Sequence, residues 1–305
     1  MKELIVIKMD IEKFKAISPN LLENESMAKH TTFRVGGKAD MYVSVKSVEE
    51  LSSLIKLARE TDTPFTVIGN GSNILVKDKG IRGLVIEIGS GISACELKGN
   101  RIYAEAGILL SRLASLALNN SLTGMEEISG IPGTLGGGIY MNAGAYGGEL
   151  KNIIKTVTYI DEYGEEKTVT ADECEFGYRK SIFTSGGKYI VSAVIELSEG
   201  DRTEISEKMA DYAKRRREKQ PLSLPSAGST FKRPEGYFAG ALIQESGLKG
   251  YKSGGAMISD LHAGFVVNYD NATSQDILDV IKHTQETVLD KFGVMLETEV
   301  KIIGE

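Results

Sequence analysis

The spacing of apolar residues predicts alternating strands and helices in the first part of the chain. Ala39–Val45 alternates apolar and polar positions, as a half-buried strand does. Apolar residues then recur at helical spacing from Val48 to Ala58, behind a capping-box pattern made by Ser47 and Glu50. Phe65–Ile68 reads as a buried strand, so the pattern predicts a strand–helix–strand unit.

The same patterns predict the elements of the remaining chain. A turn containing glycine separates two short β-rich runs, which is typical of a hairpin. At the end of the chain, alternate positions of Leu296–Ile302 share one face of a strand. The predicted strands are Ile74–Val76, Leu84–Ile88, Arg101–Ala106, the hairpin strands Val157–Ile160 and Lys167–Thr170, Tyr189–Leu197 and Leu296–Ile302; the predicted helices are 109–117, 204–219, 237–246 and 275–292.

The length of 305 residues predicts about two domains. Residues 1–30 are expected to form a helical lead-in. The composition changes to a charged helix near Gly200 and Asp201, and we place a boundary there. The resulting division is one domain at 31–200, in two parts of about 31–92 and 93–200, and a second domain at 201–305, whose last strand (about 296–303) returns to the active site.

Composition excludes several classes of protein. Hydrophobic residues make up 41% and charged residues 26%, which is typical of a globular protein, and the net charge of −6 argues against nucleic-acid binding. The two cysteines and three histidines are scattered, which excludes a disulfide scaffold and a metal cluster and fits the cytoplasm. Leu4–Ile7 is too short for a signal-peptide core, and no apolar run reaches membrane-spanning length, so we expect no membrane association.

Glycine is the unusual component, with 34 residues gathered in clusters. Two clusters, Gly69–Asn73 and Gly130–Gly138, follow predicted strands, although the chain contains neither a Walker phosphate loop nor a dinucleotide fingerprint. Successive backbone N–H groups in glycine turns can form a concave anion site. Each cluster alone is better explained as a plain glycine turn, but the pair favours a cofactor that carries phosphate.

Four other positions allow both a chemical and an ordinary structural interpretation. The basic run Arg215–Arg217 suits a phosphate clamp or a solvated helix face. Ser229 could take part in chemistry or cap a local turn, and it lacks the elbow motif of a hydrolase. Arg179 follows a glycine and could stabilise a carboxylate or an enolate, or lie exposed to water. Glu299 lies on the polar face of the last predicted strand.

Taken together, the motifs resemble one enzyme family along residues 25–304, in the right order. The matching strings are His30-Thr-Thr-Phe-Arg-Val-Gly-Gly37, Ile68-Gly-Asn-Gly-Ser-Asn73, Gly130-Ile-Pro-Gly-Thr-Leu-Gly-Gly-Gly138, Met141-Asn-Ala-Gly-Ala-Tyr-Gly147, Gly177-Tyr-Arg-Lys-Ser-Ile-Phe183, Ala227-Gly-Ser-Thr-Phe-Lys232, His262-Ala-Gly-Phe-Val-Val-Asn268 and Leu296-Glu-Thr-Glu-Val300. The set is similar to the UDP-N-acetylenolpyruvoylglucosamine reductase family, in its shorter branch (type II).

The resemblance implies an α+β fold with an FAD-binding domain of the vanillyl-alcohol-oxidase type in two subdomains and a C-terminal α+β substrate-binding domain. It implies non-covalently bound FAD, NADPH as hydride-donating co-substrate, and reduction of the enolpyruvyl group of UDP-N-acetylglucosamine-enolpyruvate to give UDP-N-acetylmuramate. We expect a cytoplasmic monomer that acts on these small molecules.

The resemblance also implies roles for individual residues. Ser229 resembles the proton donor, Arg179 the residue that stabilises the enolate, and Glu299 its acidic partner. The implied substrate-binding residues are Tyr178, Arg217, Gln220 and Lys232. The implied cofactor-binding residues are Ile68, Gly69, Asn70, Gly71, Ser72, Asn73, Ser129, Gly130, Ile131, Pro132, Gly133, Thr134, Gly136, Gly137, Asn142, Ala143 and Gly144, and no metal is implied.

Two positions depart from parts of the family. The segment between Arg179 and Tyr189 has no room for the tyrosine-bearing loop of the longer branch, and Arg233 stands where some members carry asparagine. Three alternatives stay open. They are an FAD-dependent oxidase or dehydrogenase of the same fold acting on another substrate, a nucleotide-sugar-binding module without catalysis, and a nucleic-acid binder that uses Lys214–Lys219.

Overall fold

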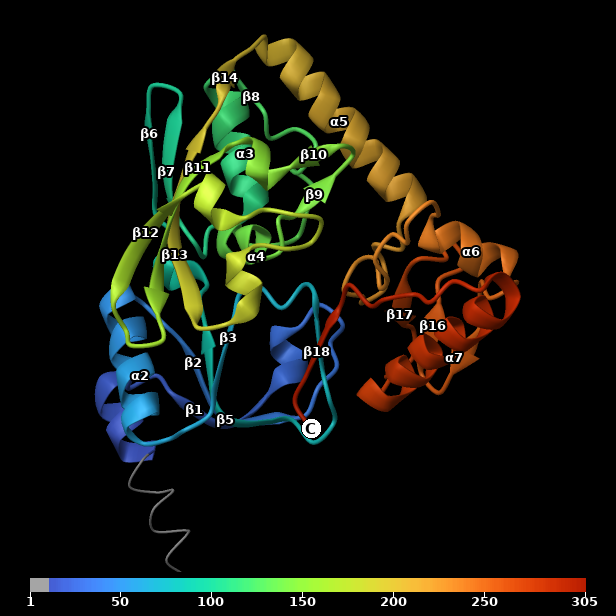
Figure 1. The fold of residues 1–305 in the computed structure, drawn as a ribbon, viewed down its shortest axis with the longest axis horizontal. Helices are drawn as coiled ribbons and strands as arrows, with labels where there is room; N and C mark the ends of the chain where they lie inside the picture. Colours follow the sequence, from blue (N-terminus) through green and yellow to red (C-terminus); the bar gives the residue numbers. More distant parts are fainter. Residues whose placement is uncertain (1–10) are drawn as a thin grey trace, which may run out of the picture. The chain divides into compact units, whose positions relative to one another are not determined.

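The computed structural model describes residues 11–305, so the stretch Leu4–Ile7 lies outside the described residues. The chain forms two compact units, whose elements are labelled in Figure 1. Unit 1 comprises the chain up to Glu23, Met41–Asn70 and Gly83–Lys214, and unit 2 comprises Asn24–Asp40, Gly71–Arg82 and Arg215–Glu305. Each unit has a hydrophobic core of its own.

The first sheet of unit 1 has the strand order β1-β2-β5-β3. Some residues of β1, β2 and β5 are assigned to unit 2. Its strands are β1 (Leu22–Ser26), β2 (Lys38–Ser44), β3 (Phe65–Ile68) and β5 (Ile81–Glu87). Helix α2 (Val48–Glu60) buries the predicted apolar stripe in the unit 1 core. The Ser47 hydroxyl accepts the Glu50 N–H as predicted, whereas the Glu50 carboxylate accepts the Lys46 N–H, so the capping box is only half formed.

The second sheet of unit 1 is antiparallel, in the order β12-β11-β13-β7-β6. The hairpin prediction is confirmed, because β11 and β12 pair through a turn in which Gly164 has φ +78°. Helix α4 packs against β7 and β13. The elements are β6 (Cys95–Lys98), β7 (Arg101–Glu105), β11 (Ile154–Asp161), β12 (Glu166–Thr170), β13 (Lys188–Glu196), α3 (Leu110–Asn119) and α4 (Leu135–Tyr140).

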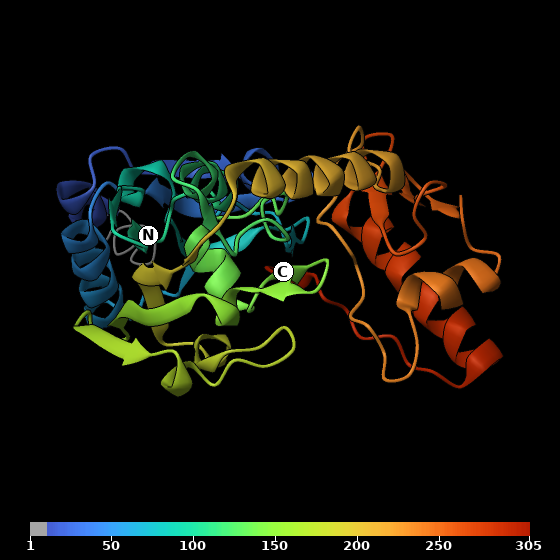
Figure 2. The same cartoon turned by 90° about the horizontal axis from the view of Figure 1, so that it is seen from above.

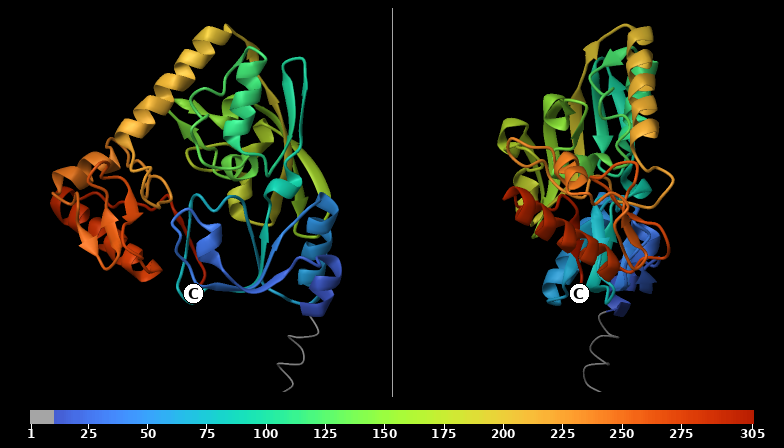
Figure 3. Two further views of the ribbon diagram at one scale, coloured as in Figure 1. Left: turned by 180° about the vertical axis from the view of Figure 1, so that it is seen from behind. Right: turned by 90° about the vertical axis from the view of Figure 1, so that its right-hand side faces the viewer.

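Unit 2 packs helix α7 on a small antiparallel sheet and helix α6 on α7, as Figure 3 shows for its C-terminal part. The sheet contains β15 (Lys252–Ser253), β16 (Ala256–Ile258) and β17 (Val266–Asn268), and the helices are α6 (Ala239–Glu245) and α7 (Ser274–Phe292). Thr273 and Asp276 form a full capping box at the start of α7, and Gly293 ends it with φ +69°. The helix predicted at 275–292 is thereby confirmed, with a cap at its start and a glycine stop at its end.

Helix α5 (Arg202–Lys219) is a continuous, highly polar helix, seen lengthwise in Figure 2. Ile205 is its one buried residue, so its basic C-terminal turn is largely a solvated face. The remaining short elements are β4 (Ile74–Val76), β8 (Leu122–Thr123), β9 (Gly144–Ala145), β10 (Gly148–Glu149), β14 (Ser198–Glu199), β18 (Lys301–Ile303) and the 3₁₀ helices η1 (Met27–His30), η2 (Ser90–Ile92), η3 (Leu150–Asn152), η4 (Asp172–Cys174) and η5 (Ile182–Ser185). No helix within residues 11–305 is long and apolar enough to cross a membrane.

Three features differ from the sequence predictions. The helical lead-in at 1–30 is wrong for Leu22–Ser26, which is strand β1; the helix covers only 11–17 of the described segment. The compact units are also not divided at 200, because β4 pairs in parallel with β18 and thereby joins Gly71–Arg82 to the C-terminal unit. The last strand is regular only from Lys301, and Ile302 is 38% exposed instead of sharing the buried face.

Candidate functional site

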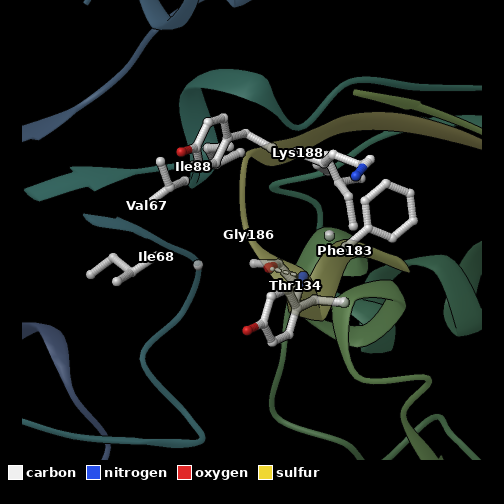
Figure 4. Close-up of a pocket in the computed structure, with 14 residues that line it drawn as sticks. Val67, Ile68, Ile88, Thr134, Phe183, Gly186 and Lys188 are labelled. Atoms are coloured by element: carbon white, nitrogen blue, oxygen red, sulfur yellow. Dashed lines mark hydrogen bonds between the residues drawn. The ribbon is translucent and has the colours of Figure 1, made fainter. Parts of the chain in front are cut away.

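The two glycine clusters meet in unit 1. The Asn70 side-chain amide donates a hydrogen bond of 2.8 Å to the Pro132 carbonyl. Gly69 lies against Thr134, where an added Cβ would come within 2.7 Å of the Thr134 hydroxyl oxygen. That hydroxyl caps α4 by accepting the Gly137 N–H at 3.4 Å, the contact drawn as a dashed line in Figure 4.

A pocket of about 240 Å³ opens at this meeting point, and Figure 4 shows the residues around it. Five of the predicted cofactor residues line it: Ile68, Gly69, Thr134, Gly136 and Gly137. The rest of its wall was missed by the sequence analysis. It comes from β3, α4, η5 and β13 and from the residues that directly follow β5, β7 and η5: Val67, Ile88, Ala106, Tyr140, Phe183, Gly186, Lys188, Tyr189 and Ile190. The hydrophobic runs predicted these strands, but nothing in the sequence indicated which side chains would face a ligand.

The wall suits a flat, largely apolar group. Gly69 and Gly136 leave no room for larger side chains, since an added Cβ at Gly136 would lie 2.9 Å from Ala106 Cβ. Burial raises the pKa of both Tyr140 and Tyr189, so their rings stay neutral at physiological pH. Lys188 is the one basic residue among those that line this pocket.

The other predicted cofactor residues lie outside the wall of this pocket. Gly71 is buried in unit 2, where its Cβ position is 1.9 Å from the His30 carbonyl oxygen and its φ is +62°. Packing therefore already requires glycine at this position. Asn73 donates to the Glu299 carbonyl at 3.2 Å, and the Ser129 hydroxyl donates to the Glu126 carbonyl at 2.7 Å. The remaining predicted residues outside the wall are Asn70, Ser72, Gly130, Ile131, Pro132, Gly133, Asn142, Ala143 and Gly144.

Arg179 occupies a tight turn of unit 1. Gly177 and Lys180 exchange backbone hydrogen bonds of 2.9 and 3.3 Å, which leaves Tyr178 and Arg179 as the turn residues. Arg179 has φ +53°, a conformation that costs a residue with a side chain roughly 1–2 kcal/mol. Its guanidinium donates to the Gly144 carbonyl at 3.2 Å. A strained arginine held in this way is typical of a functional position.

Ser229 and Glu299 lie on neighbouring segments of unit 2, and Thr230, the residue after Ser229, links the two segments. The Glu299 N–H donates to the Thr230 carbonyl at 2.8 Å, and the Thr230 N–H donates to the Gly264 carbonyl at 2.9 Å. The buried Thr230 hydroxyl also accepts the Val266 N–H at 3.0 Å. Ser229 itself is exposed, so a well-anchored backbone presents its hydroxyl at a surface.

The predicted substrate residues lie in both units. Tyr178 is exposed beside Arg179, whose guanidinium lies 5.4 Å from the Tyr178 ring centre. Arg217 is exposed on α5, and Gln220 follows the end of that helix. The Lys232 ammonium pairs with the Glu297 carboxylate at 2.8 Å, which lowers the pKa of Glu297. The structure leaves these four roles as predictions.

Comparison with known proteins gives the class of the protein. Residues 39–170 match a family model described as an FAD binding domain. With the glycine-lined pocket of unit 1, this match defines an FAD-dependent oxidoreductase. Residues 220–303 match a second model, described as the UDP-N-acetylenolpyruvoylglucosamine reductase C-terminal domain.

Whole-chain relatives specify the family. The chain is 50% identical over 285 residues to the UDP-N-acetylenolpyruvoylglucosamine reductase of Alkaliphilus oremlandii, covering 93% of this chain and 94% of the relative. It is 51% identical over 282 residues to that of Clostridioides difficile, covering 92% and 93%. A crystal structure of the reductase from Thermus caldophilus aligns with a TM-score of 0.80 at 36% identity, covering 91% of this chain and 97% of that chain. The chain belongs to the UDP-N-acetylenolpyruvoylglucosamine reductase family.

These matches confirm the expected α+β fold with an FAD-binding domain, and they confirm FAD as the cofactor. They also confirm the expected enzyme class, a reductase acting in peptidoglycan precursor synthesis.

Proposed function

We propose that this enzyme uses NADPH to reduce the enolpyruvyl group of UDP-N-acetylglucosamine-enolpyruvate, giving UDP-N-acetylmuramate. The carbon–carbon double bond gains a hydride on one carbon and a proton on the other. The names of relatives about 50% identical along the chain support this substrate class. We further propose that the protein works as a cytoplasmic monomer on these small molecules.

FAD, when bound, supplies the hydride transfer between NADPH and the substrate. The pocket beside Gly69 and Thr134 would hold one flat part of it, since about 240 Å³ is below the roughly 300–1,000 Å³ of pockets that enclose whole drug-sized ligands. None of the residues in its wall is a histidine or cysteine, which supports non-covalent binding.

Arg179 would stabilise negative charge on the substrate. Hydride addition to the vinyl ether leaves charge spread over the adjacent carboxylate, and a preorganised cation beside that carboxylate lowers the barrier. Removing one such group typically costs about 2.7–4 kcal/mol. The strained turn and the bond to the Gly144 carbonyl support this role, because both hold the guanidinium before substrate arrives.

Ser229 would then donate the proton, and Glu299 would be the acidic partner of Arg179. The observation that supports the Ser229 and Glu299 roles is the Thr230 linkage, which sets Ser229 and Glu299 on neighbouring extended segments. A serine hydroxyl is a weak acid, but a carbanion is a strong base, so transfer is favourable when the geometry is correct. A positioned general acid typically contributes about 10²–10⁴-fold in rate.

The test separates the two half-reactions in a stopped-flow experiment. Ser229→Ala should leave anaerobic flavin reduction by NADPH unchanged and slow flavin reoxidation by the enolpyruvyl substrate by about 10²–10⁴-fold. Ser226→Ala, on the same loop, is the matched control and should reoxidise at the wild-type rate.

Equal slowing of both half-reactions by Ser229→Ala would exclude the proton-donor role. A wild-type enzyme whose reduced flavin is reoxidised by oxygen but not by this substrate would instead indicate an oxidase acting on another compound.

A further inference from the structure

Asn142 was expected to bind cofactor, but its side chain is fully buried and bonded to protein groups. Its amide nitrogen donates to the Glu149 carboxylate at 3.1 Å and to the Gly177 carbonyl at 3.0 Å. Its amide oxygen accepts the Lys151 N–H at 3.0 Å. Both amide hydrogens are therefore used, and the oxygen has a backbone partner.

These bonds close a ring around the Arg179 turn. The Arg179 guanidinium donates to the Gly144 carbonyl, and Gly144 pairs with Glu149 across β9 and β10. Glu149 accepts from Asn142, and Asn142 donates to Gly177, which opens the turn that carries Arg179. The Asn142 side chain thus connects Gly177, at the start of the turn, to the β9–β10 hairpin, whose Gly144 carbonyl accepts the Arg179 guanidinium.

The charges and the backbone conformation around Asn142 suit a residue that connects the turn to the hairpin. The Lys151 ammonium lowers the pKa of Glu149, burial raises it, and Asn142 and Arg179 lower it further, so Glu149 remains a carboxylate near Arg179. Asn142 itself has φ +45°, in the left-handed region that asparagine tolerates better than most residues. Asparagine is therefore suited both to the backbone here and to the two donations.

We propose that Asn142 is a positioning residue that holds the Arg179 turn through Gly177 and Glu149, and that it does not contact the cofactor. The inference rests on the proposed role of Arg179 in the second half-reaction. Without the amide, the Gly177 carbonyl loses its side-chain donor and keeps only the longer 3.3 Å bond from the Lys180 N–H, so the turn relaxes. A displacement of about 1 Å at a catalytic group can cost about a hundredfold in rate.

The experiment uses two variants of the full-length holoenzyme. Asn142→Gly keeps the left-handed backbone and removes the amide, while Asn142→Asp keeps the shape and removes both donors. Both should retain wild-type FAD content and wild-type flavin reduction by NADPH. Reoxidation by UDP-N-acetylglucosamine-enolpyruvate should fall by about a hundredfold. Asn271→Gly, at an exposed asparagine with φ +50°, is the matched control and should reoxidise like the wild type.

A double-mutant cycle separates positioning from general damage. In the Arg179→Ala background, Asn142→Gly should cause no further loss of reoxidation rate, because the group it positions is already gone. Multiplicative losses would overturn the proposal, as would loss of FAD in both variants. If the reduced flavin of the wild-type enzyme is not reoxidised by the substrate, the proposed function fails. If the substrate reoxidises the wild-type enzyme and both Asn142 variants at the same rate, this inference alone fails.

Discussion

Replacing Gly69 with alanine tests the contact between the two glycine clusters. Its φ lies outside the left-handed region, so the backbone accepts alanine and the penalty is steric. The new Cβ would lie 2.7 Å from the Thr134 hydroxyl oxygen but 4.0 Å from Thr134 Cβ. Only the hydroxyl is in the way, so removing it should relieve the clash.

The expected energies follow from the typical costs of overpacking and of losing a helix cap. Overpacking of this kind costs about 1–3 kcal/mol of unfolding free energy, which we expect for Gly69→Ala. Thr134→Ala loses the cap of α4, a cost of roughly 1 kcal/mol because the capping bond is long, at 3.4 Å. The double variant should cost no more than Thr134→Ala alone, since the second substitution also makes room for the new methyl group.

The assay is urea unfolding at saturating FAD, followed by circular dichroism and by flavin release. The expected result is a coupling free energy of about 1–3 kcal/mol in favour of the double variant. Gly99→Ala provides the steric control, because an added Cβ there meets no atom within 4 Å, although its φ of +59° adds backbone strain. Losses from the two single substitutions that simply add would show that the clusters do not touch as described.

Two further predictions concern buried ionisable groups. Burial and then Glu173 raise the pKa of Cys174 to about 11, so iodoacetamide at pH 8 should alkylate the partly exposed Cys95 and leave Cys174 unmodified in mass spectra; rapid double labelling would contradict this. Burial acts to raise the pKa of Glu126, but hydrogen bonds from Thr123 and the Gly124 N–H hold it below the ordinary 4.5. This carboxylate therefore stabilises the fold above pH 4.5, and the contribution is lost as pH falls through the lower folded-state pKa. Glu126→Gln should cost about 1–3 kcal/mol at pH 7 and flatten the stability profile below pH 4.5, and an unchanged profile would refute this.

Local pattern was sufficient where neighbours in sequence make the structure. The apolar stripe of α2 and the helix predicted at 275–292 each depend on residues within one or two turns. The same reasoning misplaced Leu22–Ser26, because that edge strand owes its conformation to β2, a partner elsewhere in the chain. It also missed α4 inside a glycine-rich segment, where tertiary contacts with β7 and β13 override the low helix propensity of glycine.

The candidate site was predicted unevenly for the same reason. Motif order identified Arg179, Ser229 and Glu299 as residues to examine, but the positive φ of Arg179 and the Thr230 linkage arise from folding. The motif led to an expected cofactor contact for Asn142, whereas the structure shows its side-chain amide bonded to the Gly177 carbonyl and places the residue outside the pocket wall.

What the order of residues determined by itself was the set of local elements, the glycine clusters and the family to which the chain belongs. Only the tertiary structure decided that Gly71–Arg82 joins the C-terminal unit through β4 and β18, and which strands supply the pocket wall. Helical periods and caps depend on atoms a few residues apart, whereas sheet partners and pocket walls depend on contacts between residues that only folding brings together.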